Sequence, residues 1–266
     1  MPDFLGIGAQ KAGTTWLYFA LAHHPQIFMP DCKEVHFWDQ HYEKGYGWYE
    51  ELFEDAGNES GLGSPPTSVP RSGLGSSASQ QASRERTEKR TGEITPAYAI
   101  LPAERIAEIR QHYPRLHLIY MVRDPLVRAW SSALMALRRA EMRVDEASDA
   151  WFLDHFRSAG SRARGDYAAC LRAWLAHYPK EQFLLLHYDG IARAPRPMLK
   201  AAAAHIGVEE AFFDALDEAH LARRRNEGTG QPLRPSLRAA LEELYTEKQK
   251  DFTRLLKETG MAVLGA

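Results

Sequence analysis

Short apolar runs alternate with amphipathic stretches along this chain, and such alternation is typical of units in which a strand, a helix and a second strand follow one another. Residues 4–8 predict a buried strand, and residues 15–24 predict the helix after it. The strongest strand signal covers residues 116–122, and residues 182–187 predict a further strand. Because strands separated by helices pair in parallel, we expect an α/β fold in three layers, with a central parallel sheet flanked by helices.

Prolines and an acidic cap mark where other helices begin. Residues 102–113 predict a helix that begins on a proline. Asp124 is followed by proline, which is the pattern of an N-cap and a first helical position, so residues 125–138 predict another helix. Residues 166–177 add one more, and the chain from Pro195 onward has a mostly helical pattern.

One segment breaks this pattern. Residues 57–90 contain no aromatic residue, and 16 of these 34 residues are serine, glycine or proline. Such a composition cannot bury enough apolar surface to offset the entropy lost on ordering. We therefore expect a disordered or mobile low-complexity insertion, with a lid that orders over a substrate as the alternative. The remaining length fits one domain, so residues 1–266 are predicted to form a single domain that carries this insertion.

The composition narrows the range of partners. The chain has 33 Lys and Arg against 35 Asp and Glu, so it lacks the basic excess that is usual for nucleic-acid binding, and we expect no nucleic-acid partner. No window approaches 18 consecutive apolar residues, and the first residues lack a signal-peptide pattern. We therefore expect no membrane span and a cytoplasmic location.

Cysteines and histidines give no sign of a metal or a disulfide framework. Cys32 and Cys170 are far apart and form no CxxC pair, which fits two free thiols in a reducing compartment. The eleven histidines show no HExxH or other metal spacing. No metal is therefore predicted.

The loop after the first predicted strand has the features of an anion site. Gly8 and Gly13 have the spacing of the glycines in a phosphate loop of the form G-x-x-x-x-G-K-[ST], and Thr15 holds the Ser/Thr place. Thr14 stands where that loop has lysine, and Lys11 supplies a cation earlier. Glycines let several backbone N–H groups point inward, and the helix start adds partial positive charge. The changed lysine position suits a phosphate ester with fewer charges than a nucleoside triphosphate.

A second anion site is predicted where the strand over residues 116–122 ends. Ligands of open α/β sheets bind beyond the carboxyl ends of strands, and Arg123 stands at such an end. Ser131 follows two turns into the next helix, and Arg128 lies on a similar face. Two anion sites indicate a ligand with phosphates at two places. Asp124 also resembles a magnesium-binding aspartate of a kinase, although the proline after it favours an N-cap role.

Four motifs together resemble the sulfotransferases that use 3′-phosphoadenosine 5′-phosphosulfate (PAPS). Residues 10–17 resemble their 5′-phosphosulfate loop, and residues 123–125 with Ser131 resemble their 3′-phosphate site. Residues 33–39 and 92–98 resemble acceptor-side motifs of the heparan-sulfate branch, which includes the N-deacetylase/N-sulfotransferase and 3-O-sulfotransferase types. The resemblance implies a P-loop-like fold and transfer of a sulfuryl group from PAPS to an acceptor.

The resemblance also implies roles on the donor side. Lys11 would contact the 5′-phosphate and the bridging oxygen, and would steady negative charge on the leaving phosphate. The backbone of the loop and the Thr15 hydroxyl would hold that phosphate, and Trp16 would pack on the adenine. The full set of co-substrate contacts implied in this way is Lys11, Ala12, Gly13, Thr14, Thr15, Trp16, Arg123 and Ser131.

On the acceptor side, Glu34 matches the carboxylate that the heparan-sulfate branch uses as general base. His36 and Asp39 match residues beside the acceptor, with His36 a candidate catalytic residue. Tyr98 and Tyr167 are candidates for the acceptor wall. These assignments predict transfer to a hydroxyl or amine of a glycan or small molecule.

Two positions depart from the family pattern. Ala12 replaces a second glycine, and Ile94 replaces a lysine that contacts acceptor or sulfate in the glycan enzymes. The loss of that lysine puts the glycan acceptor in doubt, though not sulfuryl transfer. A nucleotide-dependent kinase and a non-catalytic nucleotide- or glycan-binding module remain as alternatives.

Overall fold

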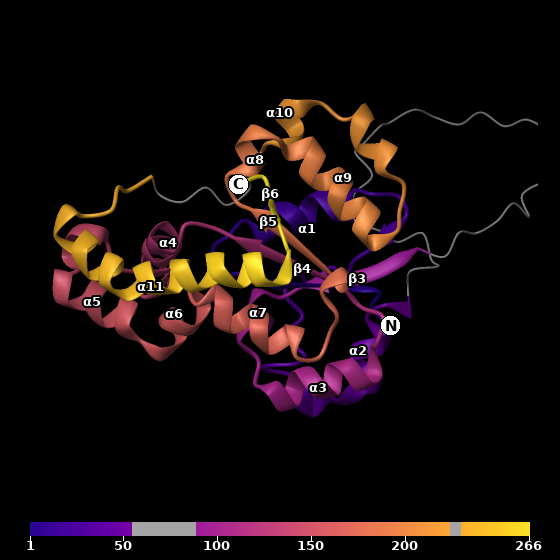
Figure 1. The fold of residues 1–266 in the computed structure, drawn as a ribbon, viewed down its shortest axis with the longest axis horizontal. Coiled ribbons are helices and arrows are strands. Elements are labelled where there is room, and N and C mark those ends of the chain that lie inside the picture. Colours follow the sequence, from indigo (N-terminus) through magenta and orange to yellow (C-terminus); the bar gives the residue numbers. More distant parts are fainter. Residues whose placement is uncertain (55–88, 224–229) are drawn as a thin grey trace, which may run out of the picture.

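A computed structural model of the chain describes residues 1–54, 89–223 and 230–266. Six strands form one sheet in the order β2-β3-β1-β4-β5-β6, and every neighbouring pair is parallel. The predicted central parallel sheet is thereby confirmed (Figure 1). The strands are β1 (Phe4–Gly8), β2 (Ile27–Phe28), β3 (Arg90–Ile94), β4 (His117–Val122), β5 (Phe183–His187) and β6 (Val263–Leu264).

Helices cover both faces of this sheet. Those labelled α1, α8, α9 and α10 lie on one side, and α3 and α7 lie on the other (Figure 1). Within the described ranges, no helix is long and apolar enough to cross a membrane. The α-helices are α1 (Thr14–Ala22), α2 (Gly45–Glu51), α3 (Ala103–His112), α4 (Pro125–Arg139), α5 (Asp149–Arg157), α6 (Ala159–Arg164), α7 (Tyr167–Leu175), α8 (Gly190–Arg193), α9 (Pro195–Ile206), α10 (Glu218–Leu221) and α11 (Pro235–Thr259). Short 3₁₀ helices are η1 (Tyr42–Lys44), η3 (Pro96–Ile100), η4 (Val144–Glu146), η5 (Lys180–Gln182) and η6 (Glu210–Ala215).

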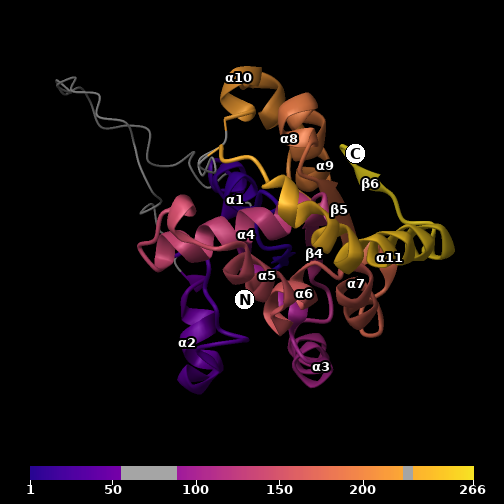
Figure 2. The same cartoon turned by 90° about the vertical axis from the view of Figure 1, so that its left-hand side faces the viewer.

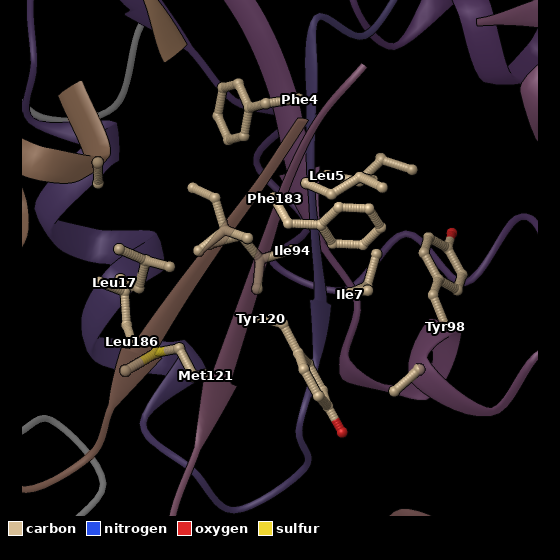
Figure 3. Close-up of a cluster of buried hydrophobic side chains, with 14 of the residues drawn as sticks. Phe4, Leu5, Ile7, Leu17, Ile94, Tyr98, Tyr120, Met121, Phe183 and Leu186 are labelled. Carbon is tan, nitrogen blue, oxygen red and sulfur yellow. The ribbon is translucent and has the colours of Figure 1, made fainter. Parts of the chain in front are cut away.

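The main core lies between the strands and these two helical layers. All five residues of β1 are buried, as expected for a parallel strand covered on both faces. Gly6 pairs with Ile94 of β3, and a Cβ at Gly6 would lie 2.7 Å from the Ile94 Cγ1. Figure 3 shows Ile94 among the apolar side chains of β1 and β4. Glycine at this position therefore makes room for the isoleucine.

A second, smaller apolar cluster forms where α4, α5 and α11 pack together beside the sheet (Figure 2). It includes Trp130, Phe152 and Leu241. The Asp124 carboxylate begins α4 by accepting a hydrogen bond from the Val127 N–H at 2.9 Å, which confirms its predicted role as an N-cap. Because α4 follows β4 directly, this cluster fixes the direction in which the chain leaves the carboxyl end of β4.

The predicted helices and strands are found with small shifts at their ends, and the C-terminal part is mostly helical as predicted. The strands β2 and β6 were missed, because two residues give no periodicity to read. The strand β3 was also not predicted, although residues 92–98 had been singled out as a motif. Most of the predicted insertion, residues 57–88, lies outside the described residues. Its predicted end is wrong, because Arg90 is the first residue of β3 and pairs with Ile27.

Candidate active site

The loop between β1 and α1 is anchored to the sheet. The Ala9 N–H donates to the Met121 carbonyl at 2.7 Å, and the Ala12 N–H donates to the Ala9 carbonyl at 3.1 Å. Gly13 precedes α1 at φ +93°, a left-handed conformation that favours glycine, and a Cβ there would lie 2.6 Å from Ile191 Cδ1. The N-cap of α1 is Gly13, which has no side chain to bond the first N–H groups of the helix. The first N–H groups of such a helix suit an anion, as the loop sequence predicted.

The two predicted anion sites lie side by side. Arg123 Nη1 donates to the Lys11 carbonyl at 3.1 Å, and the Arg123 guanidinium carbon lies 3.9 Å from the centre of the Tyr188 ring. The Tyr167 hydroxyl donates to the Arg123 carbonyl at 2.9 Å. Since β1 and β4 are neighbours in the sheet, their carboxyl ends bring the loop and Arg123 together.

Positive charge is concentrated around the Lys11 amine. Burial lowers the pKa of Lys11 below its ordinary value. The guanidinium charges of Arg138, Arg123 and Arg139 lower this pKa further, in that order. The Glu34 carboxylate has the opposite effect on the pKa of Lys11. The end of α4 and the loop that carries Glu34 therefore both come within electrostatic reach of this amine.

Glu34, His36 and Asp39 form a row of polar side chains. The Glu34 carboxylate pairs with Lys33, and its other oxygen lies 3.4 Å from His36 Nε2. His36 Nδ1 lies 3.0 Å from both carboxylate oxygens of Asp39. The side chain of Glu34 is 39% exposed, so a substrate can reach it. The structure thus brings together the three residues predicted on the acceptor side of the 33–39 motif.

A buried carboxylate anchors the loop that carries this row. Glu93, in β3, is fully buried, and its Oε2 accepts hydrogen bonds from the Val35 N–H at 3.3 Å and the Thr95 hydroxyl at 2.6 Å. Its Oε1 accepts from the hydroxyls of Tyr49 at 2.8 Å and Tyr98 at 2.9 Å. Burial raises the pKa of Glu93, and these hydrogen bonds oppose that rise.

Three acceptor-side positions lie in the interior. Tyr98 is 0% exposed and Tyr167 is 5% exposed, so neither forms an open wall. Tyr98 instead supports Glu93, and Tyr167 supports the backbone of Arg123. Ile94 is also fully buried, and no charged group is presented from its position.

The remaining donor-side residues lie on α1 and α4. Thr14 is buried and Thr15 is half-buried in the first turn of α1. The Trp16 Nε1 donates to the Leu221 carbonyl at 2.6 Å, and Trp16 lines a largely apolar cavity of about 130 Å³ together with Phe212. Ser131 is half-buried on α4.

Arg128 does not join Lys11 and Arg123, contrary to the prediction that it faces the same anion. It is fully buried, and its Nη2 donates to the Ser161 carbonyl at 3.0 Å and to the Tyr245 hydroxyl at 3.2 Å. Its side chain therefore links α4 to α6 and α11.

The chain was compared with models of known protein families. The family model described as "Sulfotransferase family" matches residues 2–214. The chain belongs to the sulfotransferase family. The matched range includes the loop, Arg123 and the Glu34 row, so the predicted family resemblance is confirmed.

Curated relatives place the chain near sulfotransferases named for heparan sulfate. It is 27% identical over 244 residues to mouse heparan sulfate glucosamine 3-O-sulfotransferase 3B1, covering 87% of this chain and 54% of that protein. It is 25% identical over 227 residues to human bifunctional heparan sulfate N-deacetylase/N-sulfotransferase 3, covering 78% of this chain and 22% of that protein. The chain spans about half the length of the 3-O-sulfotransferases that it matches.

Solved structures of sulfotransferases share the fold. A sulfotransferase from Alicyclobacillus acidocaldarius superposes with a TM-score of 0.66 at 24% identity, covering 98% of this chain and 97% of that one. Mouse sulfotransferase SULT7A1, complexed with PAP, superposes with a TM-score of 0.56 at 20% identity, covering 97% of this chain and 88% of that one. The predicted P-loop-like three-layer fold is thus confirmed.

Several residues around this candidate site were missed in the sequence. Arg138 and Arg139 end α4, and nothing in their spacing shows that they reach back to Lys11. Glu93 did leave a signal, because a glutamate inside a short buried strand needs partners. Its partners come from three separate segments, which a single sequence does not connect.

Proposed function

We propose that this protein transfers the sulfuryl group of PAPS to a hydroxyl or amine of a glycan or small-molecule acceptor. One observation carries the proposal: the Lys11 amine lies within electrostatic reach of both Arg123, on the anion side, and Glu34, on the acceptor side. A sulfuryl group that moves from a bound phosphate to an acceptor must pass from the anion side of the site to the acceptor side. Proximity of this kind supplies much of the rate of a transfer reaction.

On the donor side, the anion loop holds the 5′-phosphate and Arg123 holds the 3′-phosphate. Lys11 lies at the junction and balances the negative charge that develops on the leaving phosphate. Trp16 borders an apolar cavity that suits the adenine ring. The residues proposed to contact the co-substrate are Lys11, Ala12, Gly13, Thr14, Thr15, Trp16, Arg123 and Ser131.

The transfer needs a base for the acceptor proton. In the proposed step, the acceptor oxygen or nitrogen forms a bond to sulfur while the bond from sulfur to the bridging phosphate oxygen breaks. Glu34 takes the acceptor proton, and adenosine 3′,5′-bisphosphate (PAP) leaves with the bridging oxygen. His36, held between Glu34 and Asp39, orients the base. No metal takes part in the proposed step.

The names of the relatives support a saccharide as the acceptor. Because they are named for heparan sulfate, a saccharide hydroxyl or amine is the first acceptor to test.

Tyr98 and Tyr167 act from behind the site, as supports for Glu93 and Arg123. A cytoplasmic location and a single domain over residues 1–266 remain proposals from composition and length.

A kinase is the weaker assignment. Its magnesium aspartate would have to be Asp124, and that carboxylate is engaged as the N-cap of α4. Position 14, where a kinase loop has lysine, is occupied by threonine.

Calorimetry tests the donor side. We expect PAP to bind in the presence of EDTA, and Arg123→Gln to weaken this binding at least tenfold through loss of a charge-assisted contact. Arg238→Gln, on the exposed surface of α11, is the matched control and should have no effect. Binding of ATP with magnesium, together with no binding of PAP, would refute the proposal.

A screen with labelled PAPS tests the acceptor side. Saccharides and small hydroxylated metabolites should include an acceptor that the protein labels. With that acceptor, Glu34→Gln should lower turnover about 10²- to 10⁴-fold while PAP affinity stays unchanged. Unchanged transfer by Glu34→Gln would show that this carboxylate is not the base.

A further inference from the structure

A second cavity lies beside the candidate centre, between the C-terminal half of α4 and the helices α5 and α6. It has a volume of about 480 Å³ and opens to solvent. Gln10, Arg139, His155 and Arg164 contribute to its lining. Among the described residues that line it, none is an aspartate or a glutamate. The described lining of the cavity therefore carries cationic side chains and no carboxylate.

This cavity adjoins the groups proposed to carry out the transfer. Gln10 immediately precedes Lys11 in the anion loop, and the charge of Arg139 reaches the Lys11 amine. Arg164, in the same lining, lies within electrostatic reach of Asp39, the last member of the Glu34 row. A molecule in the cavity would therefore lie next to both Lys11 and the row that contains the base.

The positive charge of this region continues beneath the surface. Arg128 is fully buried behind Ser161, another residue of the cavity wall, and its Nε and Nη1 have no hydrogen-bond partner among the described residues. The Nε of Arg164 is likewise buried without a partner in the described part of the chain. Burial, and then the charge of Arg128, lower the pKa of both Arg164 and His155. Uncompensated buried charge is costly, so an anion in the cavity would be stabilising.

We propose that this cavity binds an acidic group of the acceptor, with Arg139 and Arg164 as its ligands. This inference rests on the proposed function and names its substrate class. The acceptor is an anion, carrying a carboxylate or sulfate beside the hydroxyl or amine that it offers to Glu34. Binding of the acid at Arg164 holds the acceptor against the Glu34 row, and a neutral analogue lacks this attachment.

Matched ligands that differ only in charge test the inference. Calorimetry is run on the protein saturated with PAP, so that the phosphate sites are filled and no turnover is needed. Two pairs serve as probes: p-nitrophenyl β-D-glucuronide against the β-D-glucoside, and 4-hydroxybenzoate against its methyl ester. We expect the acid of at least one pair to bind ten or more times tighter than its neutral partner.

Variants then assign the preference to the cavity. Arg164→Gln should abolish the difference within the pair, and Arg164→Lys should restore part of it. Arg162→Gln, on the same helix but outside the cavity lining, should keep the full preference. PAP affinity should be the same in all three variants.

Each failure has a separate meaning. If PAP binds but acid and neutral probes bind equally, or neither binds, the cavity inference is wrong and the proposed function stands. An acid preference that persists in Arg164→Gln also overturns it. If PAP itself does not bind, the proposed function and this inference fall together.

Discussion

At the scale of single residues, two charged groups of the site, Lys11 and Glu93, differ in how their charge is balanced by their surroundings. Lys11 is partly buried among three arginines and is balanced by one nearby carboxylate, Glu34. Glu93 is fully buried and is satisfied by four hydrogen-bond donors. The first arrangement attracts an anion, whereas the second fixes a loop. Removing one charge therefore tests each arrangement: the pH range of donor binding for the first, and hydrogen exchange of the loop for the second.

The charge of Arg138 is predicted to control the pH range of donor binding. Lys11 attracts phosphate only while protonated, and its lowered pKa means that this attraction is lost at a pH below that of an ordinary lysine. Of the neighbouring charges, that of Arg138 lowers this pKa most. Arg138→Gln removes it, so the loss of PAP binding should move to higher pH. Calorimetric titration of PAP from pH 7 to pH 10 measures the shift. Arg143→Gln, on the exposed turn after α4, is the control, and a downward shift in Arg138→Gln would contradict the account.

Glu93→Gln is predicted to loosen the loop of the base without weakening donor binding. The amide has one acceptor oxygen where the carboxylate had two for four donors, and its NH₂ group cannot accept a hydrogen bond from the donors that face it. Hydrogen exchange should therefore become faster in residues 33–38, whereas PAP affinity should stay within twofold. Glu34→Gln, in the same loop but exposed, should leave the exchange unchanged. Equal protection in the two variants would mean that Glu93 does not anchor the loop.

At the scale of elements, parallel strands and the turns after them assemble the site. The loop after β1 and the turn after β4 meet because these strands are neighbours in the sheet. The row from Glu34 to Asp39 reaches the same edge through Glu93, which lies on β3 at the other side of β1. Three consecutive strands of the sheet thus supply the two sides of the transfer.

The start of α1 is predicted to tolerate only glycine at position 13. Gly13→Ala places a Cβ 2.6 Å from Ile191 Cδ1 in a left-handed conformation, so both the fit and the backbone are strained. We expect a loss of about 1–3 kcal/mol in the free energy of unfolding and at least a tenfold loss of PAP affinity. Urea unfolding and calorimetry measure the two effects. Gly45→Ala has a similar positive φ in open space, so it separates backbone strain from collision and should keep full PAP affinity.

The sequence was sufficient for the elements that carry strong periodicity and for the loop chemistry. The strand before Gly8, the strand before Arg123 and the cap at Asp124 were all predictable from local pattern. The burial of Arg128 was not predictable, because the pattern of α4 does not show that α6 packs over position 128. The same reason hides the anchoring role of Tyr98, whose partner Glu93 lies in another element.

At the scale of the whole molecule, stability depends on how the layer of α9 covers the sheet. Two histidines meet at this junction: His205 of α9 and His117 of β4, with ring centres 5.0 Å apart. Burial, and then the neighbouring His117, lower the pKa of His205 to about 4. Burial and then the charge of Arg90 lower the pKa of His117. In the described part of the chain, neither His205 Nε2 nor His117 Nδ1 has a hydrogen-bond partner. The junction is thus built for two neutral rings.

Acid is therefore predicted to weaken the fold by protonating His205 in the unfolded chain. The unfolded chain binds a proton at His205 near the ordinary pKa of 6.5, whereas the folded chain does so only near 4, so the unfolded state gains protons first as pH falls through this range. The free energy of unfolding should decrease by on the order of 1 kcal/mol between pH 6.5 and pH 4.5, after allowance for partial exposure. Urea unfolding at several pH values measures the slope, which should be smaller in His205→Leu. His41→Leu replaces a half-exposed histidine at the start of η1 and should retain the slope of the natural protein. Equal slopes in the two variants would exclude the junction as the source.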